Sequence, residues 1–255
     1  MIELQNVQKS FDGGMSYAVA EISFKVERGE LLGLIGESGS GKTTTLKMIN
    51  RLEEPNQGQI LVNGRNVQDR NPEQLRRNIG YIFQGIGLFP HYSVAQNVAA
   101  VPTLLGWDPD RILSRCRDTL ELVGLDYADY AERRPDQLSG GQQQRIGVAR
   151  ALAAEPEIML MDEPFGALDP ITRAELQEEF KRIQKNLDLT VIMVTHDMTE
   201  ALLMADRIAV MKDGEVLQIG TPSELLNNPT HEYVKKLVEM PRRRAEHLER
   251  LMHSS

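Results

Sequence analysis

The chain has 255 residues, of which 41% are hydrophobic and 26% charged, the composition of an ordinary globular protein with one large or two small domains. Its formal net charge of -8 argues against non-specific nucleic-acid binding, which depends on lysine and arginine, although a local basic patch is not excluded. Cys116 is the only cysteine, so we expect no internal disulfide and a reducing compartment. The sequence opens with no secretory signal, and no apolar run approaches the roughly 20 residues of a membrane helix. If the protein acts at a membrane, we therefore expect it to be attached there by a partner protein.

The N-terminal region predicts two half-buried antiparallel strands. Apolar and polar residues alternate over residues 2–7 and again over residues 22–26. Phe11 and Tyr17 lie in the glycine-containing loop between these strands. An aromatic side chain in that place either packs in the core, which is commoner, or stacks on a nucleotide base.

A phosphate-binding loop is predicted at residues 36–43, whose sequence GESGSGKT fits G-x-x-x-x-G-K-[ST]. The apolar run 31–35 predicts a buried strand before it, and residues 43–52 predict a helix after it. In that order, glycine lets backbone N–H groups converge on phosphate, Lys42 reaches the terminal phosphates and Thr43 ligates Mg²⁺. The alternative is an ordinary Gly/Ser turn. The remaining nucleotide-binding candidates here are Gly36, Ser38, Gly39, Ser40, Gly41 and Thr44.

Further along the chain, two more strands precede an unusual apolar segment. Residues 59–62 predict a strand, and Asn63-Gly64 after it is a hairpin signal. Residues 79–83 predict a strand that ends at Gln84. Residues 85–94 are apolar but are broken by glycine and proline. A loop with that much apolar surface is unusual unless something covers it.

The central region predicts helices. Residues 109–125 predict an amphipathic helix, and Cys116 within it is interpreted as structural or incidental. Residues 133–137 predict a loop before a helix that continues through Ala153. One side of the helix at 109–125 is expected to carry Ile112, Leu113, Leu120 and Val123.

The C-terminal half alternates strands with helices. That alternation predicts a parallel α/β core, and hairpins near both ends of the chain predict an added antiparallel layer. The expected buried strands are 157–161 and 190–195, the charged helix between them is 172–187, and the terminal hairpin pairs 207–211 with 215–219.

Two carboxylates close the first of these buried strands. Asp162 would hold Mg²⁺ through water, and Glu163 would act as general base on the attacking water. The alternative is a salt-bridged carboxylate pair that merely ends a strand. The phosphate loop in the same chain favours the metal site.

The segment LSGGQ at residues 138–142 predicts a second anion site, because it opens a helix with serine and glycine amides. One ATP needs only one phosphate cradle. A two-fold symmetric dimer resolves this difficulty, since each subunit's second site would then cap the nucleotide bound by its neighbour.

The chain resembles the ATP-binding subunits of ABC transporters across nearly its whole length. The resemblance implies an α/β fold: a P-loop NTPase (RecA-like) core with an antiparallel β subdomain and an α-helical subdomain inserted at about 87–152. The ABC ATPase domain would span 1–240, bind ATP and Mg²⁺, and dimerise head to tail. The features that carry the resemblance are, in order, the phosphate loop, Gln84, 138–142, Asp162-Glu163, Ala167-Leu168-Asp169 and His196.

The resemblance also implies roles for individual residues. Phe11 matches the adenine-stacking aromatic, with Tyr17 a weaker candidate. Gln84 would touch Mg²⁺ and the attacking water, Asp169 would link the two sites, and His196 would sense the γ-phosphate. The expected catalytic residues are Lys42, Gln84, Glu163 and His196, and the expected Mg²⁺ ligands are Thr43, Gln84 and Asp162. Contacts to the opposite subunit's γ-phosphate would come from Ser139, Gly140, Gly141 and Gln142.

The resemblance further implies partners and cargo. The region 84–94, with Ile86, Leu88, Phe89 and Pro90, would receive a short helix of an integral membrane permease at the cytoplasmic face of the plasma membrane. A substrate-binding protein would take part indirectly. The runs 82–91, 105–108 and 161–170 are similar to importers of glycine betaine, carnitine and choline. An importer of another small solute, such as an amino acid, is the alternative.

Two other classes of protein are disfavoured. A nucleic-acid- or ribosome-associated ABC ATPase would need coiled coils, zinc ligands or a second cassette. A non-enzymatic regulatory nucleotide-binding module would lack Glu163 or His196, and both are present. The charged segment 241–255 predicts a short solvated tail without the CBS domains that many osmoprotectant ATPases carry. Arginines 242–244 in this tail are a weaker candidate for contact with anionic lipid. Osmotic regulation is therefore left open.

Overall fold

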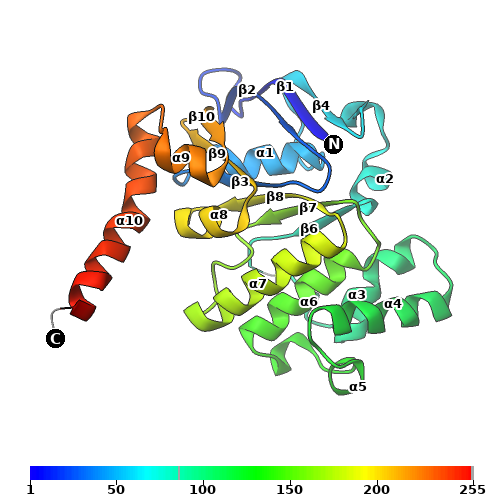
Figure 1. Ribbon diagram of the computed structural model, residues 1–255. Helices are drawn as coiled ribbons and strands as arrows, with labels where there is room; N and C mark the ends of the chain where they lie inside the picture. Colours follow the sequence, from blue (N-terminus) through cyan, green and yellow to red (C-terminus); the bar gives the residue numbers. More distant parts are fainter. Residues whose placement is uncertain (86, 254–255) are drawn as a thin grey trace.

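The computed structural model describes residues 1–85 and 87–253, and of residues 244–253 it describes only the helix that they form. A six-stranded sheet runs through its middle in the order β10-β9-β3-β8-β7-β6 (Figure 1). The pairings β9-β3, β3-β8, β8-β7 and β7-β6 are parallel, and β10 is antiparallel to β9. The strands are β3 (Leu31–Ile35), β6 (Ile79–Ile82), β7 (Ile158–Asp162), β8 (Thr190–Thr195), β9 (Arg207–Lys212) and β10 (Glu215–Gly220). The predicted parallel α/β core is confirmed.

A second, antiparallel sheet lies above the first and has the order β2-β1-β4-β5. Its strands are β1 (Ile2–Lys9), β2 (Val19–Val26), β4 (Gln57–Val62) and β5 (Arg65–Asn66). In β2 the side chains from Ile22 onward alternate between buried and exposed, as a sheet with one covered face requires. The two predicted N-terminal strands and the Asn63-Gly64 hairpin are therefore confirmed.

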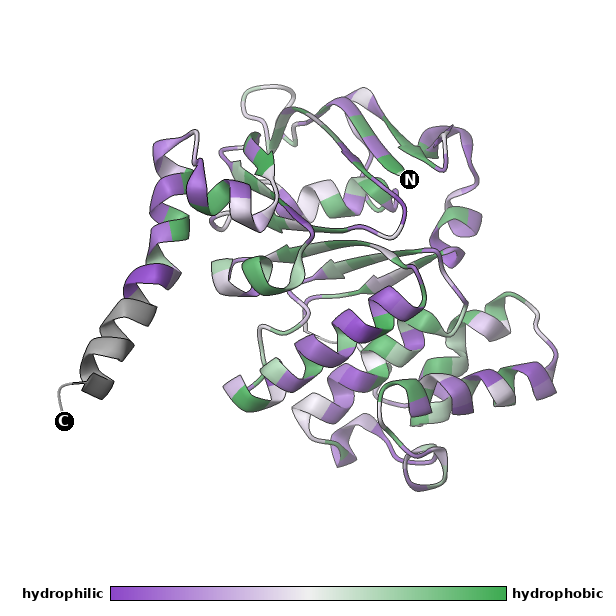
Figure 2. Ribbon diagram, viewed as in Figure 1, coloured by the Kyte–Doolittle hydropathy of each residue, from purple (hydrophilic) through white to green (hydrophobic). Residues whose placement is uncertain are grey.

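Helix α1 (Lys42–Ile49) lies between the two sheets (Figure 1). Its Leu46 and Ile49 are fully buried in one apolar cluster with Leu4 of the antiparallel sheet and Ile192 of the parallel sheet. Figure 2 shows the parallel strands as the most continuously hydrophobic part of the molecule. The phosphate loop before α1 is thus attached to the core on both sides.

The other face of the parallel sheet is covered by helices. Between β6 and β7 the described residues form only helices and loops, and α6 and α7 pack against the sheet. No helix in the described part of the chain is both long and apolar enough to cross a membrane. The helices between β6 and β9 are α3 (Val94–Leu104), α4 (Pro109–Leu122), α5 (Tyr127–Tyr130), α6 (Gly140–Leu152), α7 (Pro170–Asn186) and α8 (Met198–Met204), with the 3-10 helix η2 (Pro135–Gln137) before α6.

The chain ends in two helices that the sequence patterns did not predict, α9 (Pro222–Asn227) and α10 (Glu232–His253). The expected boundary between a domain ending at residue 240 and a tail falls inside α10, which passes through Pro241 without a break. Arg243 pairs with Glu239 one turn earlier at 2.7 Å. The described start of the predicted tail is therefore helical, and the side chains from residue 244 onward lie outside the described part.

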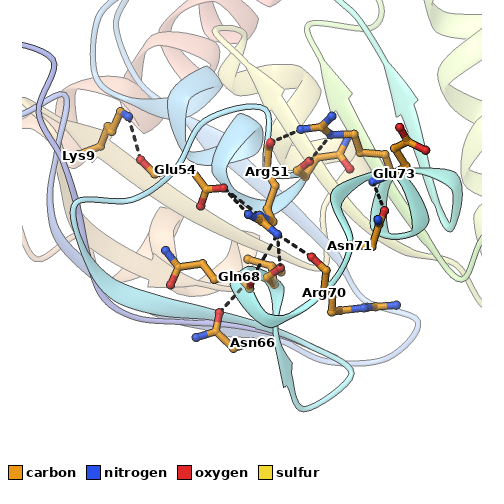
Figure 3. A network of polar contacts seen from close by, with 11 residues as sticks. Lys9, Arg51, Glu54, Asn66, Gln68, Arg70, Asn71 and Glu73 are labelled. Carbon is orange, nitrogen blue, oxygen red and sulfur yellow. Dashed lines mark hydrogen bonds and ion pairs between the residues drawn. The ribbon is translucent and has the colours of Figure 1, made fainter.

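A polar network ties the end of α1 to the segment that leads into β6 (Figure 3). The Arg51 guanidinium donates to the carbonyl oxygens of Arg70 at 2.6 Å and Val67 at 3.2 Å, and pairs with Glu54 at 2.6 Å. Arg76 in turn donates to the Arg51 carbonyl. Since β6 leads to Gln84, this network fixes the position of the phosphate-loop helix relative to the segment that carries Gln84. The segment contains η1 (Val67–Asp69) and α2 (Pro72–Arg77).

One predicted helix face needs correction. Leu113 was expected on the buried side of α4, but it is 39% exposed. Cys116 and Thr119 occupy the middle of the buried face and leave Leu113 at its edge. The pattern of apolar residues did not predict this, because Cys116 and Thr119, whose hydroxyl bonds to the backbone, take the buried positions. Burial also raises the pKa of the Cys116 thiol to about 11, in keeping with its structural interpretation.

The apolar loop before α3 is held by one buried side chain, Asn97. Its Oδ1 accepts from Phe89 N at 2.8 Å, and its Nδ2 donates to the carbonyls of Phe89, Tyr92 and Ser93 at 3.2, 3.3 and 3.0 Å. We expect Asn97→Ala to lower the free energy of unfolding by about 2–3 kcal/mol, because buried backbone groups lose their partner. Urea unfolding measures this. Asn186→Ala, at an exposed position, is the control, and an equal loss there would contradict the assignment.

Candidate functional site

Four neighbouring parallel strands deliver the predicted site residues to one edge of the sheet. The carboxyl ends of parallel strands lie at the same edge, where α/β proteins bind ligands. Here β3 leads into the 36–43 loop, β8 into His196, β7 into Glu163, and β6 towards Gln84. Residues far apart in sequence are thereby brought together.

The 36–43 loop curls tightly enough that glycine is required at two of its positions. A Cβ at Gly36 would lie 2.1 Å from the Met211 carbonyl oxygen, and one at Gly41, whose φ is +96°, would lie 2.3 Å from that of Ala18. Lys42 Nζ donates to the carbonyls of Gly36 and Glu37, each at 2.8 Å. Burial lowers the pKa of Lys42, while the charges of the neighbouring carboxylates raise it. The ammonium group therefore lies inside the loop, where phosphate would enter.

Thr43 and Asp162 meet at the start of α1. Thr43 Oγ1 donates to Asp162 Oδ1 at 3.0 Å. A hydroxyl and a single carboxylate are hard oxygen ligands, and they suit Mg²⁺, which is usually held by one or two carboxylates together with substrate phosphates. The described residues contain no group of three His, Cys, Asp or Glu that would form a cage from protein ligands alone. The donor set fits a cation shared with a nucleotide.

Burial raises the pKa of Asp162, although the Thr43 hydrogen bond opposes this. The pKa of Asp162 is therefore higher in the folded state than in the unfolded state, so ionisation of this carboxyl lowers the free energy of unfolding. The loss grows as the pH rises from the unfolded-state pKa through the folded-state pKa. We therefore expect Asp162→Asn to raise the melting temperature of the nucleotide-free chain at pH 7 and to abolish Mg²⁺-dependent hydrolysis. Calorimetry at pH 4 and 7 and a phosphate-release assay measure both effects. A lower melting temperature at pH 7 would contradict the pKa argument.

Gln84, Glu163 and His196 form a contact cluster. Gln84 Nε2 donates to Glu163 Oε2 at 3.2 Å, and His196 Nδ1 lies 3.3 Å from Glu163 Oε1. Glu163 has a left-handed backbone with φ +48°, directly after β7. The three side chains come from three different strand ends, so the predicted catalytic carboxylate is held from both sides.

The aromatic candidates lie on the loop between β1 and β2. Phe11 is 64% exposed, and Lys9 Nζ lies 4.8 Å from its ring centroid. Tyr17 is 44% exposed. Ala18, at the end of this loop, contacts the phosphate loop at Gly41. Both rings are exposed and not packed in the core, which fits base stacking better than core packing.

The 138–142 segment is not joined to this cluster. Ser139 caps α6: its Oγ accepts from Gln142 N at 3.3 Å, and Gln142 Nε2 donates to the Tyr130 hydroxyl at 3.1 Å. Among the described residues, no hydrogen bond or ion pair joins Ser139 or Gln142 to the 36–43 loop. Asp169 likewise caps α7, accepting from Thr172 N at 3.1 Å, and its bond with Thr172 lowers its pKa. Gly140 and Gly141 begin α6.

Two residues beside the cluster escaped the sequence patterns. Glu200 is only 7% exposed, and Arg173 lies with it at the lining of a small cavity next to Glu163 and His196. A glutamate in the first turn of a helix is typical of a solvated capping residue, so the sequence predicts an exposed Glu200. Its burial becomes visible only in the packing of α7 against α8.

The comparisons with known proteins agree with this geometry. The sequence model of the ABC transporter family matches residues 19–166. The choline transport ATP-binding protein of Bacillus subtilis is 54% identical over 93% of this chain and 62% of its own length. The glycine betaine uptake system ATP-binding protein of Escherichia coli is 50% identical over 92% of this chain and 76% of its own. The chain thus spans about six tenths of the length of the first of these relatives.

Solved structures are similar over most of the chain. A dimeric ATP-binding cassette in a post-hydrolysis state, bound to ADP and Pi, has a TM-score of 0.77 at 34% identity, covering 87% of this chain and 99% of its own. A Clostridium perfringens protein that is part of an ABC transporter complex has a TM-score of 0.83 at 28% identity, with 97% and 98% covered. The predicted P-loop fold class is confirmed.

Proposed function

Because this chain belongs to the ABC transporter family, we propose that it is the ATP-binding and ATP-hydrolysing subunit of an importer of quaternary-amine osmoprotectants. The observation that carries the proposal is the contact of Glu163 with both Gln84 and His196 beside the Lys42 loop. The names of the relatives, which include choline and glycine betaine transport, support the class of cargo.

In the proposed reaction, Glu163 takes the proton from the water that attacks the γ-phosphate, the bond from the γ-phosphorus to the β–γ bridging oxygen breaks, and ADP and phosphate leave. Bound Mg²⁺ supplies charge neutralisation to the phosphates. Lys42 holds the terminal phosphates, and Gln84 and His196 keep the Glu163 carboxylate in place. Because no hydrogen bond or ion pair among the described residues joins Ser139 to its own chain's phosphate loop, the site is completed by the 138–142 segment of a second copy in a head-to-tail homodimer. An ADP-bound dimeric cassette among the similar structures supports this pairing.

We also propose that a permease helix docks in a groove of about 420 Å³ beside the Gln84 segment, at the cytoplasmic face of the membrane. Phe89 and Leu104, which line it, are 49% and 63% exposed. Ile86, predicted to be covered here, lies outside the described residues.

The groove gives a direct prediction. We expect Leu104→Gln to reduce permease-stimulated ATP hydrolysis at least fivefold, because a polar group replaces an apolar contact, and to leave the isolated chain's stability unchanged. Leu203→Gln is the matched control, since Leu203 is 65% exposed and lies away from the groove. Equal effects of both variants would contradict docking here.

Cargo is tested on the complex with its permease in liposomes. We expect hydrolysis to be stimulated by glycine betaine, carnitine or choline presented with the cognate binding protein. Stimulation by amino acids and not by quaternary amines would refute the osmoprotectant assignment and leave the ATPase assignment standing.

A further inference from the structure

A small polar cavity of about 40 Å³ lies next to the proposed catalytic base. Its lining includes Glu163 and His196, and also Arg173, Thr195 and Glu200, for which the proposed reaction has no use. A cavity of this size is large enough for one water molecule, provided that two to four polar groups face it. The lining meets that condition.

Arg173 has one buried donor without a partner among the described residues. Its Nη2 donates to the Leu168 carbonyl at 2.9 Å, which ties the start of α7 to the loop between Glu163 and Asp169. Its Nε is buried and has no hydrogen-bond partner among the described residues. A buried guanidinium N–H without a partner costs stability, so a bound acceptor is expected beside it.

Glu200 lies in the first turn of α8, the helix that follows His196. Its Oε1 accepts from Gln177 Nε2 at 2.9 Å. Its pKa is raised, chiefly by burial and also by the charge of Asp197, and the hydrogen bonds from Thr195 and Gln177 and the charge of Arg173 offset this only in part. Thr195 directly precedes His196, and its hydroxyl also accepts from Asp197 N at 3.0 Å. Glu200 is thus attached to the segment that carries His196.

We propose that one ordered water fills this cavity, accepts from Arg173 Nε and donates to Glu200, so that Arg173 and Glu200 act as positioning residues for Glu163. The bridge joins the loop of Glu163 and Asp169 to the loop of His196. Its closure fixes the distance between the base and the histidine. The inference rests on the proposed hydrolytic function and adds two residues to it.

The test uses the full chain with Arg173→Met, Arg173→Lys, Glu200→Gln and the Arg173→Met/Glu200→Gln double variant. Each single change is expected to lower kcat for ATP about tenfold, with KM within twofold of its original value. The double variant should be no slower than Arg173→Met or Glu200→Gln alone, because both changes break the same bridge. Arg173→Lys keeps the charge but has a carbon atom at the position of Nε, so it should be as slow as Arg173→Met. Glu178→Gln, exposed on the same helix, should keep full activity.

Additive losses, full activity in Arg173→Lys, or a rise in KM without loss of kcat would overturn the bridge. A crystal structure of the unaltered chain tests it without any variant: water within hydrogen-bond distance of Arg173 Nε supports the bridge, and an empty cavity overturns it. If the unaltered chain hydrolyses no ATP, or if Glu163→Gln keeps full turnover, it is the proposed function that fails.

Discussion

Replacing Glu163 by glutamine is expected to reduce ATP turnover by about 10²–10⁴-fold while ATP still binds. Glutamine keeps the size of the side chain and can still contact Gln84 and His196, which lie 3.2 and 3.3 Å from the two carboxylate oxygens. It cannot accept the proton of the attacking water. The variant should therefore stop before the chemical step, and phosphate release together with binding of a fluorescent ATP analogue measures the two properties separately.

The same variant should accumulate as a closed dimer, since nucleotide that is not hydrolysed continues to hold two copies together. Size-exclusion chromatography with and without Mg-ATP checks this. Glu178→Gln, which removes an exposed carboxylate of α7, serves as the matched control and should hydrolyse ATP normally. Undiminished turnover by the Glu163 variant would remove the general base from the mechanism.

Lys42→Ala is expected to abolish hydrolysis and to weaken ATP binding more than tenfold. The Lys42 ammonium lies within the curled loop, 2.8 Å from two of its carbonyl oxygens. It is therefore a preorganised cation that phosphate can reach without bringing in a new side chain. Titration with fluorescent ATP and a phosphate-release assay measure the two losses.

Lys235→Ala removes an exposed lysine of α10 and is the control for the loss of a positive charge. Circular dichroism should show the Lys42 variant folded, because its neighbours in α1 are held by the apolar core between the sheets. Normal ATP turnover by Lys42→Ala would refute the assignment of this loop.

Much of the fold could be predicted because its signals are local. The apolar runs at 31–35, 157–161 and 190–195 each became a buried strand, and the residues after them lie at the candidate site. Parallel pairing then required those strand ends to meet, so the approach of Thr43 to Asp162 followed from topology. A one-residue uncertainty at a strand end did not affect that conclusion.

The missed features depend on contacts that local periodicity does not contain. Helix α3 was not predicted, since proline is disfavoured inside a helix and Pro102 lies within its range. The buried Asn97 and Glu200 carry polar side chains that a pattern assigns to the surface. Their partners come from backbone carbonyls or from helices distant in sequence. Only the packed chain could identify them.

The central claim is that the Lys42 loop is half of a site whose other half comes from a second copy. Sedimentation of Glu163→Gln with saturating Mg-ATP tests it most directly, alone and combined with Ser139→Arg, while a fluorescent analogue confirms that nucleotide stays bound. The account predicts a dimer for Glu163→Gln and a monomer with bound ATP for the combined variant. A monomer in the first case, or an undiminished dimer in the second, would contradict it.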